Sequence, residues 1–186
     1  DEASRLGIPM VRRADALAAI MASKQGVVVC GMHGKTTTSA MAAHLLRAGG
    51  LKPSHYVGAE IPILGKNPRA ISYGHSPEAR YRLVDLTTKN FCSYFRVQRD
   101  GEILGDVILN IPGAHNALNA LAAIALASEI GVPFDKIAAA LETFRGARRR
   151  FEILYGSPRQ IVVDDYGHHP TEIAATLATA RTGPNN

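Results

Sequence analysis

The stretch GVVVCGMHGKTTTSAMAAHLL, residues 26–46, constrains the fold more than any other part of this chain of 186 residues. It opens with a β-branched apolar run, which is typical of a buried strand. A glycine turn follows, and apolar positions then recur at helical intervals until Gly49 and Gly50 stop the pattern. The succession of buried strand, glycine turn and helix favours an α/β fold with a mostly parallel central sheet.

The glycine turn contains Gly31, Gly34, Lys35 and Thr36 in the pattern G-x-x-G-K-T. Glycines let backbone N–H groups approach an anion, and the start of a helix adds partial positive charge. Lys35 can reach the β- and γ-phosphates of a nucleotide, while the Thr36 hydroxyl can ligate Mg²⁺. The strict P-loop pattern requires one more glycine, at the place of Val29. We predict a phosphate-binding loop; the alternative is a helix start with incidental glycines.

Hydrophobic periodicity and turn residues divide the rest of the chain into short elements. The predicted helices cover residues 14–24, 36–48, 115–131, 134–144 and 170–181. The predicted strands cover residues 26–30, 54–64, 69–74, 81–86, 149–156 and 159–165, with a β-hairpin over 91–110 around Asp100-Gly101. A domain boundary is expected between residues 146 and 158, where a new series of strand, turn and helix begins.

Charge and cysteine content narrow the classes of partner. The net charge is +5, but basic residues are scattered apart from the run RGARRR at 145–150, so no nucleic-acid partner is expected. No apolar run approaches the about 18 residues that span a bilayer, so no membrane partner is expected. The two cysteines, Cys30 and Cys92, have no partner spacing, which favours a reducing compartment over a disulfide framework.

Two further motifs carry amides and arginines. The run GAHNALNALAA places Asn116 and Asn119 on one helix face, where amides can pair with the edge of an adenine. The alternative is that Asn116 caps the helix and Asn119 is a tolerated polar residue. The run RRRFE ends in Arg150, and its arginines suit phosphate contacts or, alternatively, a solvated edge.

A polar cluster follows the last predicted strand. The run VVDDYGHHPTE contains Asp165, Tyr166, His168 and His169 beyond the strand's carboxyl end, which is where α/β proteins place ligands. Adjacent histidines cannot easily face one metal ion from a regular element. The alternatives are a ligand site and a capping turn.

Taken together, the runs GMHGKTTT, GAHNALNALAA, RRRFE and VDDYGHHPTE resemble, in order, the motifs of the Mur ligase family, the ATP-dependent amino-acid ligases of peptidoglycan precursor synthesis. The resemblance extends from about residue 5 to about residue 181. Met32 departs from the threonine usual in the family's loop, which leaves the backbone cradle intact but removes one hydroxyl.

The resemblance implies a function. Within the family, DDYGHHP is most similar to the members that join L-alanine to the carboxylate of UDP-N-acetylmuramate through an acyl phosphate, with release of ADP and phosphate. The implied cofactors are ATP and Mg²⁺, and the implied compartment is the bacterial cytoplasm. Phosphoryl transfer of this kind depends on positioning and charge compensation more than on covalent help from the protein.

The resemblance also implies residue roles. Lys35, Thr36, Arg150 and His168 would serve the reaction, with Thr36 on the metal. The residues implied to bind the nucleotide are Gly31, His33, Gly34, Lys35, Thr36, Thr37, Asn116, Asn119, Arg150 and Asp165. Among these, Asn116 and Asn119 would contact adenine, Arg150 the phosphates and Asp165 the ribose. Tyr166 and His169 would lie near the nucleotide or the acceptor.

Three domains are implied by the resemblance. Residues 1–24 would be the exit from a UDP-sugar domain, residues 25–150 the ATP-binding domain, and residues 151–186 the start of an amino-acid-binding domain with a Rossmann-like fold. A long family segment that carries an acidic Mg²⁺-binding motif is missing where Gly65 meets Lys66. Glu60 and Asp85 are the nearby carboxylates that could replace it, and neither sits in a matching context.

Three other functions stay open from the residues. A related ligase of the same family attaches a ready-made tripeptide to UDP-N-acetylmuramate, and its motifs also include ARRR and a double histidine. The chain could instead be a nucleotide-binding module without catalysis. A nucleic-acid binder is the third alternative. The oligomeric state cannot be read from these motifs.

Overall fold

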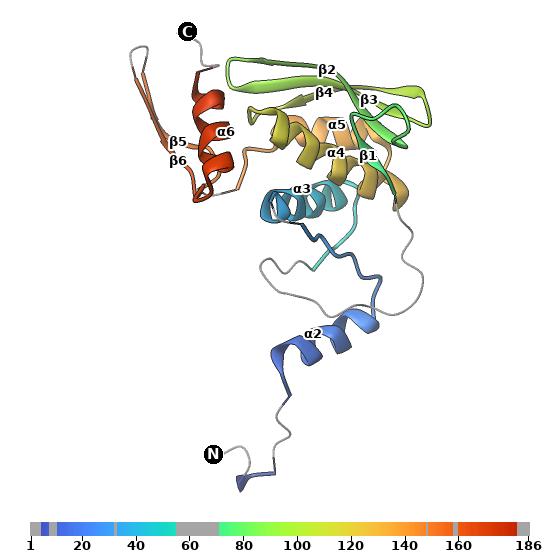
Figure 1. Ribbon diagram of the computed structural model, residues 1–186. Coiled ribbons are helices and arrows are strands. Elements are labelled where there is room, and N and C mark those ends of the chain that lie inside the picture. The colour runs from blue at the N-terminus through green and yellow to red at the C-terminus, as the bar shows by residue number, and fades with distance from the viewer. Residues whose placement is uncertain are drawn as a thin grey trace.

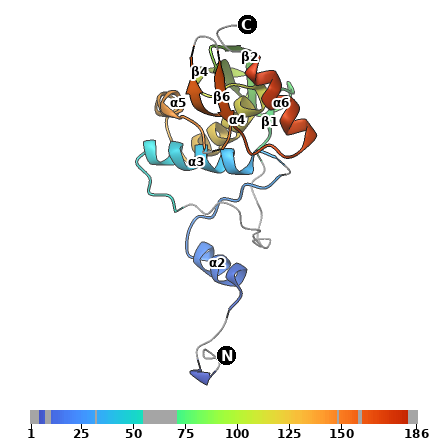
Figure 2. The same ribbon diagram turned by 90° about the vertical axis from the view of Figure 1, so that its left-hand side faces the viewer.

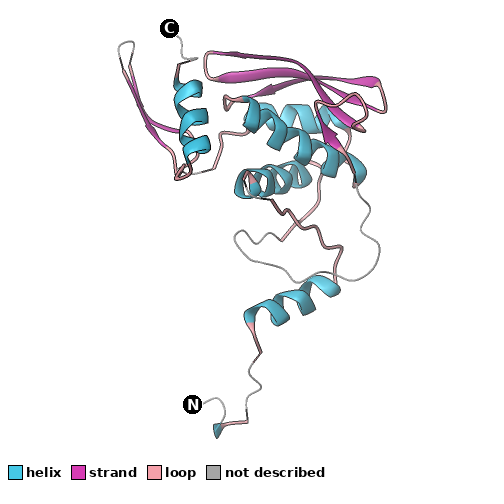
Figure 3. Ribbon diagram, viewed as in Figure 1, coloured by secondary structure: helices cyan, strands magenta, loops and turns pink. Residues whose placement is uncertain are grey.

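The structure, a computed structural model, describes residues 5–7, 11–31, 33–54, 71–147, 149–157 and 160–181. Helix α2 (Arg13–Ala22) lies apart from a main body that contains helices α3 (Lys35–Ala48), α4 (Ala114–Glu129) and α5 (Phe134–Thr143) beneath one sheet (Figure 1). Strands and helices both contribute to this body (Figure 3). The predicted α/β class is confirmed.

The main sheet is mostly antiparallel. Within the described residues its order is β1 (Tyr73–Gly74), β2 (Tyr81–Lys89), β3 (Cys92–Arg99) and β4 (Glu102–Leu109). Only β1 and β2 run parallel; β2, β3 and β4 form an antiparallel meander. The predicted hairpin is confirmed, because Arg99 pairs with Glu102 across Asp100 and Gly101. Both turn residues have positive φ, at 52° and 88°, which matches the right-handed twist of the strands.

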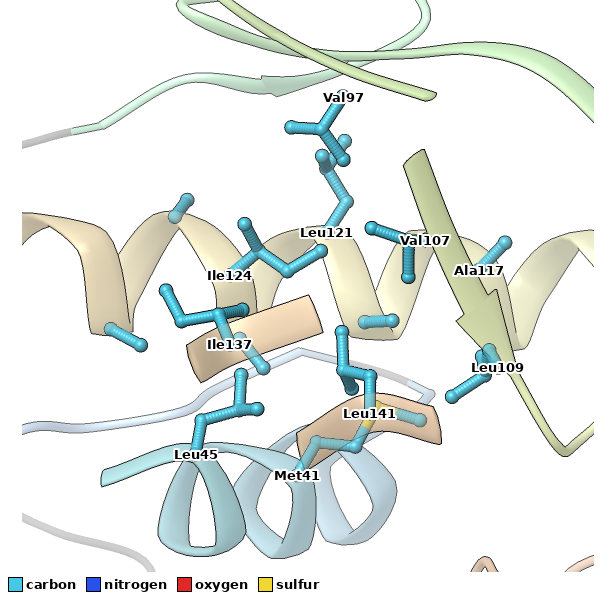
Figure 4. Close-up of a cluster of buried hydrophobic side chains, with 14 of the residues drawn as sticks. Met41, Leu45, Val97, Val107, Leu109, Ala117, Leu121, Ile124, Ile137 and Leu141 are labelled. Carbon is cyan, nitrogen blue, oxygen red and sulfur yellow. The ribbon is translucent and has the colours of Figure 1, made fainter. Parts of the chain in front are cut away.

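A continuous apolar core lies between the sheet and the helices. Alternate residues of β3 and β4, including Phe95, Val97, Val107 and Leu109, are buried. Figure 4 shows side chains of α3, α4 and α5 pointing toward these strands and toward one another. The fully buried helix residues at the centre are Met41, Leu45, Leu121, Ile124, Ile137 and Leu141. The predicted helical periodicities of 36–48, 115–131 and 134–144 therefore identify core-facing helices. Over the stretches that could be described, every helix is too short or too polar to cross a bilayer.

A smaller unit follows the core. Strands β5 (Glu152–Gly156) and β6 (Ile161–Asp164) pair antiparallel, and helix α6 (Pro170–Ala180) comes next in the chain. These elements match the predicted strands 149–156 and 159–165 and the predicted helix 170–181. Their apolar faces stay open, with large exposed fractions at Ile153, Leu154, Tyr155, Val162, Ile173 and Leu177.

The predicted buried strand at residues 26–30 is wrong in this structure. Residues 25–30 have no regular secondary structure, and Val27 and Val28 are 40% and 45% exposed. A buried strand of a parallel sheet needs partner strands at its edges and helices on its faces. No strand in the described part of the chain pairs with this segment. The described main sheet therefore has one parallel pair, β1 with β2, and is otherwise antiparallel, unlike the predicted mostly parallel sheet. The predicted strand 54–64 and the junction of Gly65 with Lys66 lie outside the described residues, as do residues 69 and 70 of the strand 69–74.

Candidate functional site

The glycine loop leads directly into α3. Gly34 is the residue before the helix and has a left-handed backbone, with φ of 78°. A Cβ atom at Gly34 would lie 2.3 Å from Oδ1 of Asn119 on α4, so a side chain there would displace the Asn119 amide, and the left-handed backbone also favours glycine. The Thr38 N–H donates to the Gly34 carbonyl at 2.8 Å and starts the helical ladder. This loop has the tight backbone that close approach of an anion requires.

The charged and hydroxyl groups of the loop lie at the helix start. The Lys35 ammonium donates to the Gly31 carbonyl at 2.6 Å, which closes the loop on itself. Thr36 is half-buried, whereas Thr37 is buried at the first turn of α3. Gly31 and His33 are exposed on the loop, and Met32 lies outside the described residues. An exposed loop with a lysine at a helix N-terminus fits a phosphate group.

The two asparagines of α4 differ in their surroundings. Asn119 is half-buried and lies against Gly34, so it faces the loop. Asn116 is buried, and its Nδ2 donates to the Pro112 carbonyl at 2.7 Å. The residue before α4 is Gly113, so the alternative in which Asn116 caps the helix is wrong; it bonds back to the chain from inside the first turn. Only Asn119 of this pair has a described contact with the glycine loop.

The arginine run and the aspartate turn are joined by hydrogen bonds. Asp165 accepts the N–H of Phe151 at 2.8 Å through Oδ2 and the N–H of Gly167 at 2.7 Å through Oδ1. The Tyr166 N–H donates to the Arg149 carbonyl at 2.8 Å. The guanidinium carbons of Arg149 and Arg150 lie 4.8 and 5.9 Å from the centre of the Tyr166 ring. Asp165 thus holds the turn together.

His115, at the start of α4, interacts electrostatically with Asp165, Arg150 and Glu172. Surrounding protein lowers the pKa of this imidazole by desolvation, although the residue keeps a solvent-exposed part. The Asp165 carboxylate opposes that shift, Arg150 reinforces it and Glu172 opposes it. A Cβ atom at Gly113 would lie 3.0 Å from Oγ1 of Thr179, so the start of α4 lies beside α6.

A contact between distant parts of the chain completes the site. Nδ1 of His33 lies 2.7 Å from Oε1 of Glu172, and the rings of His33 and His169 are 5.5 Å apart. Figure 2 shows the start of α3 and the start of α6 on the same side of the molecule. The glycine loop therefore contacts α4 through Gly34 and α6 through His33.

Glu172 is the residue of this site that sequence reasoning missed. His169 is the residue before α6, its side chain accepts the Thr171 N–H, and Glu172 completes a capping box at the third helical position. The local pattern H-P-T-E could have indicated the cap. It could not have indicated the bond to His33, because that bond joins residues 139 positions apart.

The remaining candidate residues are His168 and the carboxylates considered for the metal ion. His168 is exposed, and its Nδ1 lies 3.2 Å from the Tyr166 carbonyl. Asp85 is exposed on β2 and pairs with Arg96 of β3 on the open face of the sheet. Glu60 lies outside the described residues. The part of the chain that the structure describes contains no group of three or more His, Cys, Asp or Glu side chains able to hold a metal ion. The Thr36 hydroxyl could give Mg²⁺ one ligand. The described residues around it do not supply the other ligands.

Comparison with known proteins gives two family matches. Residues 60–127 match the Mur ligase middle domain, and residues 149–186 match the glutamate ligase domain of Mur ligases. The UDP-N-acetylmuramate–L-alanine ligase of Geotalea uraniireducens is 32% identical over 98% of this chain and 57% of its own length. The same enzyme of Acidothermus cellulolyticus is 34% identical over 94% of this chain and 54% of its own length. The chain spans little more than half the length of these curated relatives.

A solved structure supports the fold. The crystal structure of the UDP-N-acetylmuramate–alanine ligase of Thermotoga maritima superposes with a TM-score of 0.58 and 36% identity. The superposition covers 62% of this chain and 27% of the other.

Proposed function

Because this chain belongs to the Mur ligase family, we propose that it forms the nucleotide-binding part of an ATP-dependent ligase of peptidoglycan precursor synthesis. The substrates would be UDP-N-acetylmuramate and L-alanine. ATP would supply the phosphoryl group that activates the sugar carboxylate as an acyl phosphate, which the amine of L-alanine then displaces to form the amide. The names of the curated relatives support this choice of substrates.

The observation that carries the proposal is the convergence of two other motifs on the glycine loop. Gly34 packs against Asn119, His33 bonds to Glu172, and Lys35 sits at the first position of α3. A backbone loop at a helix N-terminus, with a lysine beside it, compensates the charge of phosphates. An isolated helix start with incidental glycines would not require contacts from two other motifs.

Individual roles follow from these positions. Lys35 would neutralise the phosphates, Gly31, His33, Gly34 and Thr37 would form their cradle, and Thr36 would give Mg²⁺ one ligand. Asn119 lies close enough to the loop to contact the nucleotide from the α4 side. Arg150 would compensate phosphate charge, as the resemblance of the run RRRFE to the family's motif implies. Each carboxylate oxygen of Asp165 accepts one backbone N–H and keeps a further lone pair, with which it would accept a hydrogen bond from a ribose hydroxyl. His168 would reach the acceptor from its exposed position, and Asn116 would support the helix from within.

The domain limits stay a proposal. Residues 1–24 would be the exit of a UDP-sugar domain, 25–150 the ATP-binding domain and 151–186 the start of the amino-acid-binding domain. The match to the Geotalea enzyme extends over 264 residues, more than this chain contains, so the relative carries residues that this chain lacks within the matched span. That difference supports a missing segment between Gly65 and Lys66, which would supply the carboxylate for Mg²⁺. The enzyme would act in the bacterial cytoplasm, where ATP is produced.

The test is an ADP-release assay on the full-length protein with UDP-N-acetylmuramate, ATP and Mg²⁺. We expect release that depends on L-alanine and that is lost in Lys35→Ala. Release with a tripeptide instead of L-alanine would assign the protein to the recycling branch of the family. Nucleotide binding without release under either acceptor would identify a binding module, and binding that survives Lys35→Ala but falls steeply with salt would indicate a nucleic-acid binder.

A further inference from the structure

The contact between His33 and Glu172 joins the phosphate loop to the C-terminal unit. The His33 side chain is 46% exposed, whereas that of Glu172 is 19% exposed. The other carboxylate oxygen of Glu172 accepts the backbone N–H groups of His168 at 3.3 Å and His169 at 3.4 Å. One carboxylate therefore binds a loop that precedes α3 and a turn that precedes α6.

The chemistry of the pair fixes which atom of the imidazole donates. Hydrogen bonds from His33 first, and from the two backbone N–H groups, lower the pKa of Glu172 from 4.5 to about 2, so the carboxylate is ionised at neutral pH. An ionised carboxylate can only accept hydrogen bonds. Nδ1 of His33 must then carry a hydrogen and donate a hydrogen bond to Glu172. Nε2 is then the ring nitrogen that can contact a ligand bound at the loop.

The loop is held from two sides at adjacent residues. Gly34 lies so close to Asn119 that a Cβ would displace the Asn119 amide, and His33 bonds to Glu172. The first contact comes from α4 within the core, and the second comes from α6 outside it. Orientation of a binding group by a second residue typically sets both its tautomer and its geometry.

We propose that Glu172 is a positioning residue for nucleotide binding: it orients His33 in the phosphate loop, and it does so only when the turn 165–172 is docked on that loop. This inference rests on the proposed function. Its consequence is a coupling between docking of the C-terminal unit and nucleotide affinity. By linkage, bound nucleotide strengthens the docking by the same factor as docking strengthens nucleotide binding.

The experiment is a double-mutant cycle in the full-length protein, with ADP as the probe and calorimetry as the measurement. We expect Glu172→Ala and His33→Ala each to weaken ADP binding about tenfold, which is the size of typical couplings. The double variant should bind no more weakly than either single variant, because both remove the same link. Glu172→Gln keeps an acceptor oxygen and should lose only about threefold.

A matched control separates positioning from simple support of α6. Thr171→Gly weakens the start of the same helix without removing either partner of the contact. ADP affinity should stay at the wild-type value in this variant. An equal loss in Thr171→Gly and Glu172→Ala, or additive losses in the double variant, would overturn the proposal.

A spectroscopic readout tests the contact independently of affinity. In protein labelled with ¹⁵N-histidine, the His33 ring, assigned by its disappearance in His33→Ala, should show a protonated Nδ1. Glu172→Ala should shift that proton toward Nε2. If the wild-type protein does not bind ADP, or if Lys35→Ala binds it equally well, the proposed function fails and this inference falls with it. If ADP binding depends on Lys35 but His33 keeps its ring protonation in Glu172→Ala, only the inference fails.

Discussion

The core and the C-terminal unit are held by different forces. The core buries side chains from α3, α4 and α5 against one face of the sheet. The C-terminal unit of β5, β6 and α6 buries few residues, among them Phe151 next to β5 and Thr179 in α6, and exposes apolar side chains on each of its elements. Glu172 bonds to His33 of the glycine loop, and the ring of Phe151 lies 5.8 Å from the ring of Phe91 in the turn between β2 and β3. Apolar burial therefore dominates in the core, whereas the described contacts of the C-terminal unit with the glycine loop are one polar bond and one contact between imidazole rings.

The largest test of this difference replaces one leucine in each region. Leu121 is 0% exposed in α4, and Leu177 is 57% exposed in α6. Leu121→Ala should lower the free energy of unfolding by about 2–5 kcal/mol, because it removes contacts and leaves a cavity. Leu177→Ala should change it by about 0.5 kcal/mol or less. Urea unfolding followed by circular dichroism measures both, and equal losses would contradict the comparison.

Two glycines with positive φ test the same comparison at the glycine loop. Gly34 and Gly131 have φ of 78° and 95°, but only Gly34 faces a close neighbour. An alanine costs about 1–2 kcal/mol in that backbone region at either place. Gly34→Ala should in addition displace Asn119 and weaken ADP binding at least about tenfold, by analogy with other misplaced binding groups. Gly131→Ala should leave the ADP affinity unchanged in the same titration; a comparable loss there would trace the effect to the backbone alone.

The turn before α6 provides a local test. Asp165→Ala removes the acceptor of two backbone N–H groups, and each lost bond costs about 0.5–1.5 kcal/mol. We expect the amide of Gly167 to exchange faster with solvent while the amides of α4 keep their protection. Hydrogen exchange followed by NMR measures both sets. Faster exchange throughout α4 would show that the turn and the core unfold as one unit.

The smallest expected effect is on the pH dependence of stability, because Glu172 changes its protonation only in acid. Glu172 has a pKa of about 2 in the folded protein and 4.5 as its ordinary value. A carboxyl with a lowered folded pKa stabilises above its unfolded pKa, and that contribution is lost as pH falls from about 4.5 to about 2. Glu172→Gln should flatten the stability profile within this window, measured as the melting temperature at each pH. Leu121→Ala should shift the whole profile without changing its shape.

Core helices and the hairpin could be predicted because their signals are local. The helical spacing of Leu121 and Ile124 indicates a buried face, and the pair Asp100-Gly101 indicates a two-residue turn. The strand at 26–30 was predicted wrongly, since its apolar residues indicate burial only when other strands pair with them. The meander of β2 with β3 was not predicted either: strand β2 continues past Asp85, where a bulge with φ of 54° interrupts the register.

The site could be predicted only as separate motifs. Lys35 and Gly34 followed from the loop pattern, and Asp165 from its place beyond a strand. Their assembly through Asn119 and Glu172 depends on contacts between segments far apart in the chain, which no periodicity records. Asn116 illustrates the limit: an asparagine near a helix start suggests a cap, but its amide bonds to Pro112 instead.

The distance along the chain between His33 and Glu172 also bears on the order of folding. The strands of the meander are neighbours in sequence, whereas the two site residues are 139 positions apart. Closing a long loop costs more chain entropy than closing a short one, and contacts of high sequence separation form slowly. We expect the helices and the meander to form first and the link from the loop to α6 last. Recovery of nucleotide binding after dilution from denaturant would then lag behind recovery of helical signal.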